Sequence, residues 1–290
     1  MIPTVSPDLN ILDESFDENR ALSCKLAVQI SSVHLACTVL DLQESRYLAA
    51  QIYRFPEQAT AGDFCHQLRE IAASGILSWH FASANLFVSN QLYTLVPWPL
   101  FNPSKQEDYL RFNLSGLQAD VIYLTDRLPG LDAVVVFAIH RWLKDELSAI
   151  FGTARLHHTI SPFVESILGR FKYAGSDPAV FLNIQPDIVE MLILDNHKVS
   201  LCNTFKYVTP EDLLYYTMFV LEQSGLTPDQ VPLMITGEVG KHAPVIENLT
   251  AFFPHIDFVT RNDAFRYAPS FEEIPGHYLH NLLNAEHCEL

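Results

Sequence analysis

Short apolar runs alternate with turn residues in the second half of the chain. Runs of this length, bounded by Pro, Asp and Asn, predict β-strands. Thr209 and Asp212 then have the spacing of a helix cap, and Pro210 suits the first helical position. Ser224-Gly225 predicts the end of that helix. The three runs are residues 180–184, 188–194 and 199–208.

The same order of features occurs earlier in the chain. Three apolar runs are again followed by a cap, Thr60 with Asp63, and by a helix end at Ser74-Gly75. The two stretches share pattern and turn positions while few of their residues are identical. An ordered series of matched features predicts an internal duplication. The earlier runs are residues 26–30, 34–41 and 46–55.

Further strands and helices are predicted after each of these units, and their alternation indicates α/β architecture. Gly175-Ser176-Asp177-Pro178 has the composition of a linker. The further strands are expected at residues 86–88, 93–96, 120–125, 133–139, 155–159, 232–236 and 255–260. The further helices are expected at residues 103–112, 141–151, 161–171, 244–253 and 272–286. The predicted domains are an N-terminal arm (1–23), a first lobe (24–175) with a small subdomain inserted at about 91–160, and a second lobe (176–290).

Composition narrows the possible partners. The 290 residues are 49% hydrophobic, which is enough for the core of two lobes. With 34 acidic and 18 basic residues the formal charge is −16, which argues against nucleic acid or an anionic membrane as partner. The longest apolar run, near residues 133–139, is too short for insertion into a bilayer. Five cysteines without C-x-x-C spacing indicate a reducing compartment, so we expect a cytoplasmic protein.

Two copies of three strands and a helix, each followed by a further strand and helix, resemble the actin-like ATPase superfamily of sugar kinases, heat-shock chaperones and actins. Residues 233–249, LMITGEVGKHAPVIENL, are similar to the adenosine loop of that superfamily. The resemblance implies that Gly237, Glu238 and Gly240 would line an adenosine site. The alternative is that these glycines have a structural role, in a tight turn that packs a helix on a strand.

The middle of the chain resembles a smaller group within the superfamily. Residues 120–139 and the helix bearing Trp142 are similar to the small subdomain of bacterial division actin homologues and type IV pilus assembly proteins. Over residues 26–259 the chain resembles an uncharacterised bacterial family. The resemblance implies a duplicated actin-like ATPase (ribonuclease H-like) fold with two lobes and a small inserted subdomain in the first.

The two phosphate-binding turns depart from the superfamily pattern. Active members carry an acidic residue and glycines in the first turn, where residues 29–33 read Gln-Ile-Ser-Ser-Val. The second turn, residues 183–187, reads Asn-Ile-Gln-Pro-Asp, and Pro186 has no N–H for a phosphate. Asp187 could bind a metal, although Asp after Pro is also a common turn residue. Hydrolysis by the superfamily mechanism is therefore not expected.

Other motifs add no catalytic centre. Residues 237–241 lack the spacing of a phosphate-binding P-loop. Histidine and cysteine near the C-terminus have ligand chemistry, but their spacing matches no closed zinc pattern, so no metal site is predicted. These residues are His277, His280, His287 and Cys288. Adjacent strand residues such as His157 and His158 face opposite ways and do not serve one site together.

From these observations we expect a non-catalytic actin-like scaffold or interaction protein with degenerate phosphate turns. It would bind a protein partner or itself and would need no cofactor. The alternative is a divergent ATP-binding enzyme, either an ATPase or a small-molecule kinase. In that alternative Asp187 takes the acidic catalytic role, and ATP with Mg²⁺ is the cofactor.

Overall fold

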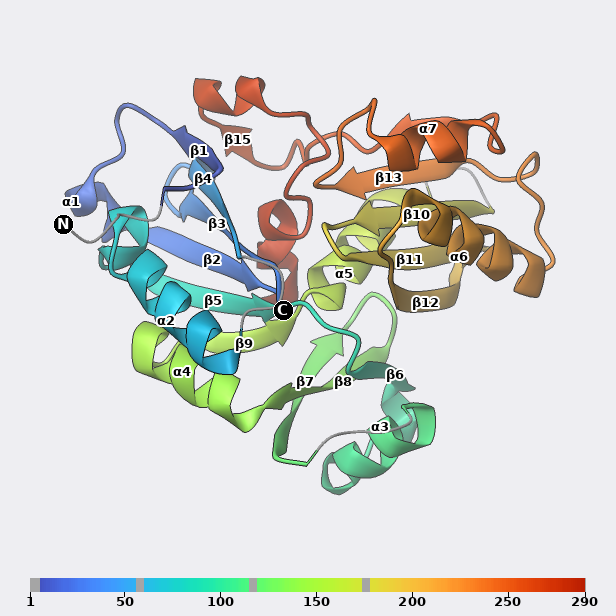
Figure 1. Ribbon diagram of the computed structural model, residues 1–290, viewed down its shortest axis with the longest axis horizontal. Coiled ribbons are helices and arrows are strands. Elements are labelled where there is room, and N and C mark those ends of the chain that lie inside the picture. The colour runs from blue at the N-terminus through green and yellow to red at the C-terminus, as the bar shows by residue number, and fades with distance from the viewer. Residues whose placement is uncertain (1–5, 56–59, 115–118, 174–177, 290) are drawn as a thin grey trace. The chain divides into compact units, whose positions relative to one another are not determined.

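The computed structural model describes residues 6–55, 60–114, 119–173 and 178–289, with side chains up to Glu286. Within it the chain forms two compact units, each built from strands and helices (Figure 1). Unit one comprises Met1–Arg127, Asp132–Ser161 and Asp263–Glu273, and unit two comprises Leu128–Leu131, Pro162–Asn262 and Ile274–Leu290. The predicted α/β architecture is confirmed. The predicted linker lies outside the described residues except for Pro178, and the predicted lobe boundary at residues 175 and 176 falls in the same gap.

Unit one is built on a seven-stranded sheet with the order β1-β4-β3-β2-β5-β9 and with β15 beside β4. The strands β2, β3 and β4 are antiparallel, and β5 and β9 continue the sheet in parallel. Every residue of β2 and β3 is buried, and apolar residues make up most of both strands. The strands are β1 (Leu9–Leu12), β2 (Cys24–Ile30), β3 (His34–Asp41), β4 (Arg46–Arg54), β5 (Ser83–Val88), β9 (Arg155–His158) and β15 (Arg266–Tyr267).

Unit two is built on a five-stranded sheet with the order β12-β11-β10-β13-β14. Its first three strands are antiparallel and its last two continue in parallel, so strand order and direction match β4-β3-β2-β5-β9 of unit one. The strands are β10 (Ala179–Ile184), β11 (Ile188–Asp195), β12 (Lys198–Lys206), β13 (Leu233–Gly237) and β14 (Ile256–Phe258). The longer helices of the chain are α2 (Ala61–Ala72), α3 (Gln106–Asn113), α4 (Arg141–Phe151), α5 (Ile160–Phe171), α6 (Pro210–Gln223) and α7 (Pro244–Thr250).

Capping boxes begin the helices α2 and α6 at the predicted residues. The Thr60 hydroxyl accepts from the Asp63 amide, and the Asp63 carboxylate accepts from the Thr60 amide. Thr209 and Asp212 make the same pair of bonds at the start of α6. Gly225 follows the end of α6 with φ of +69°, a conformation that glycine adopts without strain. The predicted starts and the predicted end of α6 are confirmed.

A separate three-stranded sheet lies between β5 and α4 in the sequence, with the order β6-β8-β7. Its strands are β6 (Tyr93–Pro97), β7 (Val121–Leu128) and β8 (Ala133–His140). Leu110 of α3 packs with Val96 and Val134 to form a small core of its own. The later part of the predicted insertion joins the large sheet of unit one, because β9 pairs with β5 and α4 contacts α2.

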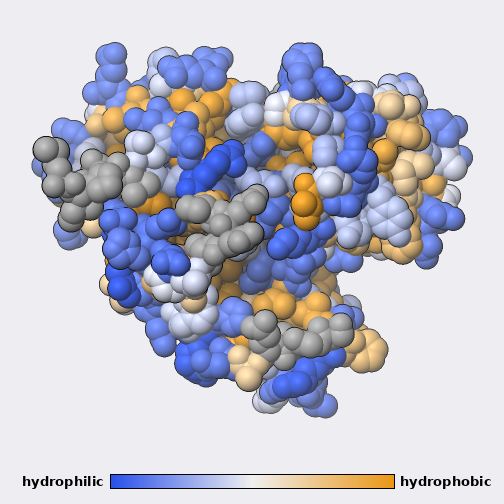
Figure 2. Space-filling view, in the orientation of Figure 1, coloured by the Kyte–Doolittle hydropathy of each residue, from blue (hydrophilic) through white to orange (hydrophobic). Residues whose placement is uncertain are grey.

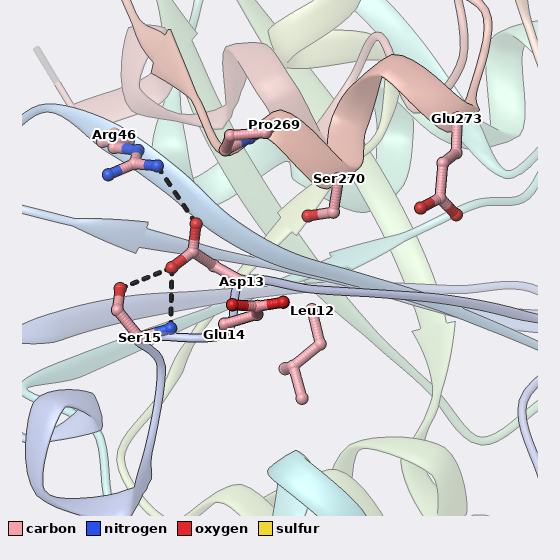
Figure 3. A pocket seen from close by; sticks show the side chains of 8 residues that line it. All are labelled: Leu12, Asp13, Glu14, Ser15, Arg46, Pro269, Ser270 and Glu273. Atoms are coloured by element: carbon pink, nitrogen blue, oxygen red, sulfur yellow. Dashed lines mark hydrogen bonds and ion pairs between the residues drawn. The ribbon is translucent and has the colours of Figure 1, made fainter.

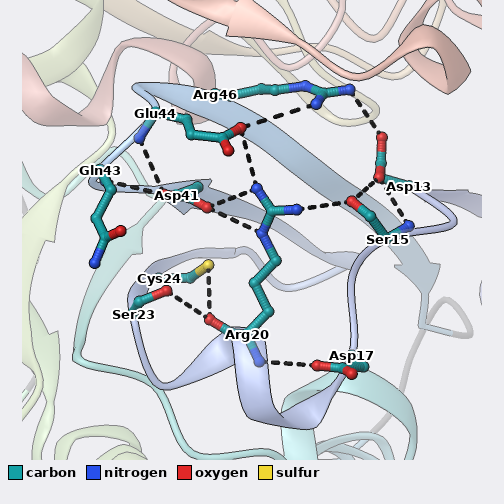
Figure 4. A network of polar contacts seen from close by, with 10 residues as sticks. All are labelled: Asp13, Ser15, Asp17, Arg20, Ser23, Cys24, Asp41, Gln43, Glu44 and Arg46. Carbon is teal, nitrogen blue, oxygen red and sulfur yellow. Dashed lines mark hydrogen bonds and ion pairs between the residues drawn. The ribbon is translucent and has the colours of Figure 1, made fainter.

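The N-terminal segment adds a strand and a short helix to unit one. Strand β1 pairs with β4, and α1 (Glu18–Ala21) follows it. Arg20 holds this segment to the end of β3, since its guanidinium donates to Asp41 at 2.9 and 3.0 Å (Figure 4). Burial alone would raise the pKa of Asp41, but hydrogen bonds from the Glu44 amide and from Arg20 outweigh it and lower that pKa. Within the predicted N-terminal arm, β1 therefore forms an edge of the sheet and α1 is held to the end of β3.

The predicted helix at residues 272–286 is wrong. Two 3-10 helices, η4 (Pro269–Glu273) and η5 (Leu282–Glu289), occupy its ends, with turns between them. Pro275 and Gly276 break the helical pattern, and Leu279 has φ of +55°, which an α-helix does not contain. The final predicted strand is also followed by one more, β15, which pairs with β4.

Thr209→Ala is expected to lower the free energy of unfolding by about 1 kcal/mol, because the Asp212 amide loses its side-chain acceptor. Thr209→Ser keeps a hydroxyl at this position and is expected to stay close to the unmodified protein. Urea unfolding of both variants measures the difference. Equal losses in the two variants would show that the cap is not the cause.

Candidate functional site

The turn between β2 and β3 is closed by its own hydrogen bonds. The Ser31 hydroxyl accepts from the amides of Val33 at 3.2 Å and of His34 at 3.1 Å. The Ser31 amide in turn donates to the carbonyl of His34 at 3.0 Å. These three N–H groups are therefore used inside the turn. A phosphate-binding turn would instead direct such groups at its ligand.

His34, which ends this turn, is fully buried and neutral. Its Nδ1 lies 2.8 Å from the Ser31 hydroxyl and its Nε2 lies 3.3 Å from the Gln29 amide nitrogen. Burial, with a smaller effect from the charge of Arg54, lowers the pKa of His34 to about 3. The turn thus contains no acid for a metal and no cation for a phosphate.

The turn between β10 and β11 is closed in a similar way. The Gln185 amide donates to the Ile188 carbonyl at 2.9 Å, and Pro186 has no N–H. The Tyr207 hydroxyl donates to the Gln185 carbonyl at 2.5 Å. Burial, followed by the nearby carboxylates of Asp187 and Glu238, raises the pKa of Tyr207 to about 12. Two carboxylates therefore lie near this turn, and the hydroxyl beside them stays protonated.

Gly237 packs directly on the same turn. Its φ is +99°, and a Cβ atom there would lie 2.1 Å from the Ile184 carbonyl oxygen. Its amide donates to the His277 carbonyl at 3.0 Å, and the Glu238 amide donates to the Ile184 carbonyl at 2.8 Å. The glycine thus permits close packing of β13 against the end of β10. The assignment of Gly237, Glu238 and Gly240 to an adenosine loop stays a prediction.

These features do not fit a nucleotide held in the manner of an active superfamily member. The first turn has neither glycine nor acid, and the second has a proline where an N–H would be needed. The space next to Gly237 is filled by the protein's own backbone. Asp187 lies at the second turn, as the sequence predicted, and the catalytic role it has in the alternative stays a prediction.

A buried carboxylate behind the second turn was missed by the sequence reasoning. Glu190 in β11 is fully buried and accepts from the Asn183 amide group at 2.6 Å and from that of Asn281 at 3.0 Å. Thr236 donates to the Asn183 side-chain oxygen at 3.1 Å. A charged residue within the apolar run 188–194 was the available signal, because buried charges require partners. The network ties the C-terminal segment to the sheet of unit two.

Asp126, His157 and Ser161 form a second buried group, in unit one. The carboxylate lies 2.8 Å from His157 Nδ1 and accepts from the Ser161 hydroxyl at 2.7 Å. The serine therefore bonds to the carboxylate and not to the imidazole, which is the wrong arrangement for an activated nucleophile. His157 stacks on Phe87, whereas His158 contacts other rings. Its hydrogen bonds join β7, β9 and the start of α5.

The C-terminal histidines also have structural partners. His277 Nε2 lies 2.8 Å from the Val239 carbonyl, and His280 Nε2 lies 2.8 Å from the Ser166 hydroxyl. The side chains of His287 and Cys288 lie outside the described residues. In the described part of the chain, no three His, Cys, Asp or Glu side chains are grouped to hold a metal ion.

Unit one contains a hollow of about 750 Å³ beside β1 and η4 (Figure 3). Asp13, Glu14 and Glu273 supply three carboxylates to its wall, against one guanidinium from Arg46. Arg46 is paired with Asp13 at 3.0 Å. The hollow is therefore acidic and does not suit a phosphate group.

Comparison with known proteins gives a family and a fold. The model of a family described as a protein of unknown function, DUF3822, matches residues 13–256. No curated protein matches the sequence. In the described part of the chain, no helix has the length and apolar character needed to cross a bilayer.

Three solved structures illustrate the fold. A Bacteroides thetaiotaomicron protein with an actin-like ATPase fold and unknown function has 15% identity and a TM-score of 0.73 over 84% of this chain and 93% of that one. The PilM-PilN type IV pilus biogenesis complex has 13% identity and a TM-score of 0.62 over 93% of this chain and 100% of that one. The ethanolamine utilization protein EutJ from Carboxydothermus hydrogenoformans has 9% identity and a TM-score of 0.50 over 94% of this chain and 92% of that one. The chain therefore has the actin-like ATPase fold, as predicted, and identities this low carry no function with them.

Gly237→Ala is expected to lower the free energy of unfolding by more than about 2 kcal/mol, because both φ and the Ile184 carbonyl oppose a Cβ atom. Gly240→Ala is the matched control, since a Cβ there meets nothing nearer than the Tyr278 hydroxyl at 4.0 Å. Urea unfolding compares the two variants. Similar small effects in both would contradict the close packing at Gly237.

The buried, neutral His34 is expected to make stability depend on pH. The unfolded chain protonates this residue near pH 6.5 and the folded chain only near pH 3, so the unfolded state binds more protons between these values. The free energy of unfolding should therefore fall by about 1 kcal/mol for this group between about pH 7 and pH 5.5.

His34→Gln should remove this part of the pH dependence, measured by urea unfolding at the two pH values. His66→Gln is the control, because the His66 side chain is 73% exposed. The free energy of unfolding should therefore change less with pH in His34→Gln than in His66→Gln, whatever the stability of each variant at neutral pH. A slope unchanged by His34→Gln would show that this residue does not carry the effect.

Proposed function

The chain belongs to the DUF3822 family, and we propose that it is a non-catalytic protein with the actin-like ATPase fold that binds a protein partner. One observation carries the proposal: in both turns that would receive phosphate, amides make bonds within the turn. Ser31 supplies the acceptor in the first turn, and the Ile188 carbonyl supplies it in the second. A ligand would have to break these bonds before it could replace them.

Two further observations support protein binding. The PilM-PilN structure is a complex of a protein with this fold and a protein partner. A net charge of −16 disfavours nucleic acid and anionic lipid surfaces as partners. Self-association is the other form that binding through this fold could take.

We place the protein in the cytoplasm. Cys24, Cys37, Cys65 and Cys202 form no disulfide bond in the part of the chain that the structure describes. Burial raises the pKa of Cys37 to about 12 and of Cys24 to about 11, so both are unreactive core residues. Free structural thiols are typical of a reducing compartment.

Phosphate release from Mg-ATP tests the non-catalytic role. The purified protein is expected to release no more phosphate than Asp187→Ala, the variant that removes the acid of the alternative mechanism. The melting temperature measured with Mg-ATP and Mg-ADP reports binding separately, because ligand at a hundredfold excess over its dissociation constant adds about 2.7 kcal/mol. No shift is expected.

Turnover that is present in the unmodified protein and absent in Asp187→Ala would overturn the proposal and establish the divergent ATP-binding enzyme. A melting shift without turnover would keep the non-catalytic role and add a bound nucleotide. In that case Gly240→Ala, which does not disturb packing, tests whether residues 237–240 line the site.

A further inference from the structure

Helix α6 is apolar on more sides than a surface helix normally is. Its buried side, which includes Leu213, Val220 and Leu221, packs on the sheet of unit two. The opposite side exposes Tyr215 at 63% and Phe219 at 42%. A helix at the surface of a stable fold usually carries polar residues on the side that faces water. The outer side of α6 therefore has the composition of a contact surface.

The exposed aromatic residues lie in one line along the helix. Tyr215 and Phe219 are four residues apart, and their rings stack with centroids 6.2 Å apart and an interplanar angle of 16°. Glu211 precedes Tyr215 by one turn and Glu222 follows Phe219 by one turn. The line thus has two aromatic rings in the middle and a carboxylate at each end.

Helix α7 extends this surface sideways. The strands β12, β13 and β14 run in the same direction, so α6 and α7, which connect them in turn, also run in parallel. The side chain of Asn248 in α7 donates a hydrogen bond to Glu211 in α6 at 3.2 Å and so connects the two helices. Phe252, which is 54% exposed, lies in the turn directly after the end of α7.

We call Tyr215, Phe219 and Phe252 the α6–α7 face. In the space-filling view, orange and pale side chains gather over these two helices (Figure 2). The helices themselves carry only negative charge: four carboxylates and no lysine or arginine. The carboxylates are those of Glu211, Asp212, Glu222 and Glu247.

The lysines nearest to the two helices in sequence precede them and do not lie on them. Lys206 precedes α6 at the end of β12 and is the nearest lysine before the helix in sequence. Lys241 precedes α7, and its ammonium lies 5.5 Å from the centre of the Phe258 ring. An apolar centre with acidic ends remains. Its complement is an apolar centre with basic ends.

We propose that the α6–α7 face binds an amphipathic helix of another protein, one that carries lysine or arginine beside its apolar anchors. Apolar anchors at helical spacing would cover the rings of Tyr215 and Phe219, and basic residues would meet Glu211 and Glu222. This inference rests on the proposed role in protein binding and names the partner's chemistry.

A second copy of this chain is the less suitable occupant. A two-fold symmetric pair of α6 helices would bring Glu211 of one copy to Glu222 of the other, and like charges would repel. The chain as a whole carries −16, which adds to that repulsion. The charge pattern therefore selects a basic partner.

The test uses a synthetic amphipathic helix of about 18 residues, roughly five turns, made of leucine and lysine. Its counterpart has glutamate in place of every lysine. Fluorescence anisotropy measures the binding of each peptide to the full-length protein. The lysine peptide should bind and the glutamate peptide should not. Binding should weaken about tenfold or more in Tyr215→Ser/Phe219→Ser, as expected for removal of two central aromatic anchors.

Charge and position have separate controls. Glu211→Gln/Glu222→Gln should weaken binding and flatten its dependence on salt, because two ion pairs are lost. Phe112→Ser removes a ring that is 89% exposed on α3 and should leave binding unchanged. Melting temperatures of Phe112→Ser and of Glu211→Gln/Glu222→Gln should stay close to that of the unmodified protein, because these side chains are exposed. Phe219 is more than half buried, so the melting temperature of Tyr215→Ser/Phe219→Ser is measured to verify that this variant is folded at the temperature of the binding assay.

Three outcomes would overturn this inference. One is equal binding of the glutamate peptide, and another is lysine-peptide binding that Tyr215→Ser/Phe219→Ser leaves unchanged. The third is dimerisation, seen by sedimentation, that this double variant abolishes, because the occupant would then be a second copy. Absent phosphate release together with any of these results would leave the non-catalytic role intact and remove only the assignment of this face.

Discussion

Each N–H group in a turn beside a buried strand needs an acceptor, and the source of that acceptor determines what the turn can bind. At the end of β2 the acceptors are the Ser31 hydroxyl and the His34 carbonyl. At the end of β10 the Ile188 carbonyl accepts from the Gln185 amide. An incoming phosphate would exchange one hydrogen bond for another, and such an exchange yields little net free energy. The proposed loss of catalysis follows from this constraint.

The same constraint explains why the ends of β10 and β13 are so tightly joined. The Ile184 carbonyl accepts from the Glu238 amide, and this bond requires β13 to approach so closely that only glycine fits at position 237. Behind it, Glu190 holds both Asn183 and Asn281 through buried hydrogen bonds. A buried carboxylate is tolerated only with such partners, so this end of unit two is specified by polar contacts as well as by packing.

Local features of the fold could be predicted from the sequence because their causes are local. Thr60 and Thr209 cap helices through residues three positions later, and the central strands of both sheets are mainly apolar because they are buried. The predicted C-terminal helix is wrong because Pro275 and Gly276 break it and because the chain there makes contacts with distant residues. His280 and Asn281 are buried by partners more than ninety positions away in sequence, Ser166 and Glu190, and no local pattern reveals such pairs.

The sequence shows which phosphate-binding residues the candidate site lacks, but it does not show the contacts that the residues present make instead. The absence of glycine near Ser31 is visible in the sequence, but the bonds that its hydroxyl makes to two amides depend on the turn geometry. Gly237 was recognised as part of a turn, whereas its contact with Ile184 depends on the pairing of β10 with β13. Pairing between distant strands is set by the whole sheet, and so it appears only in the structure.

Because the turns after β2 and β10 bond internally, we look for a binding site on the exposed side of α6. Exposed apolar area is unfavourable by roughly 25 cal/mol per Å², so the exposed part of the aromatic line on α6 represents free energy available for binding. The carboxylates at both ends of that line, together with a net charge of −16, keep such a surface soluble and repel another copy of itself. The two properties act together: aromatic area supplies affinity, and the surrounding charge restricts it to partners of opposite sign.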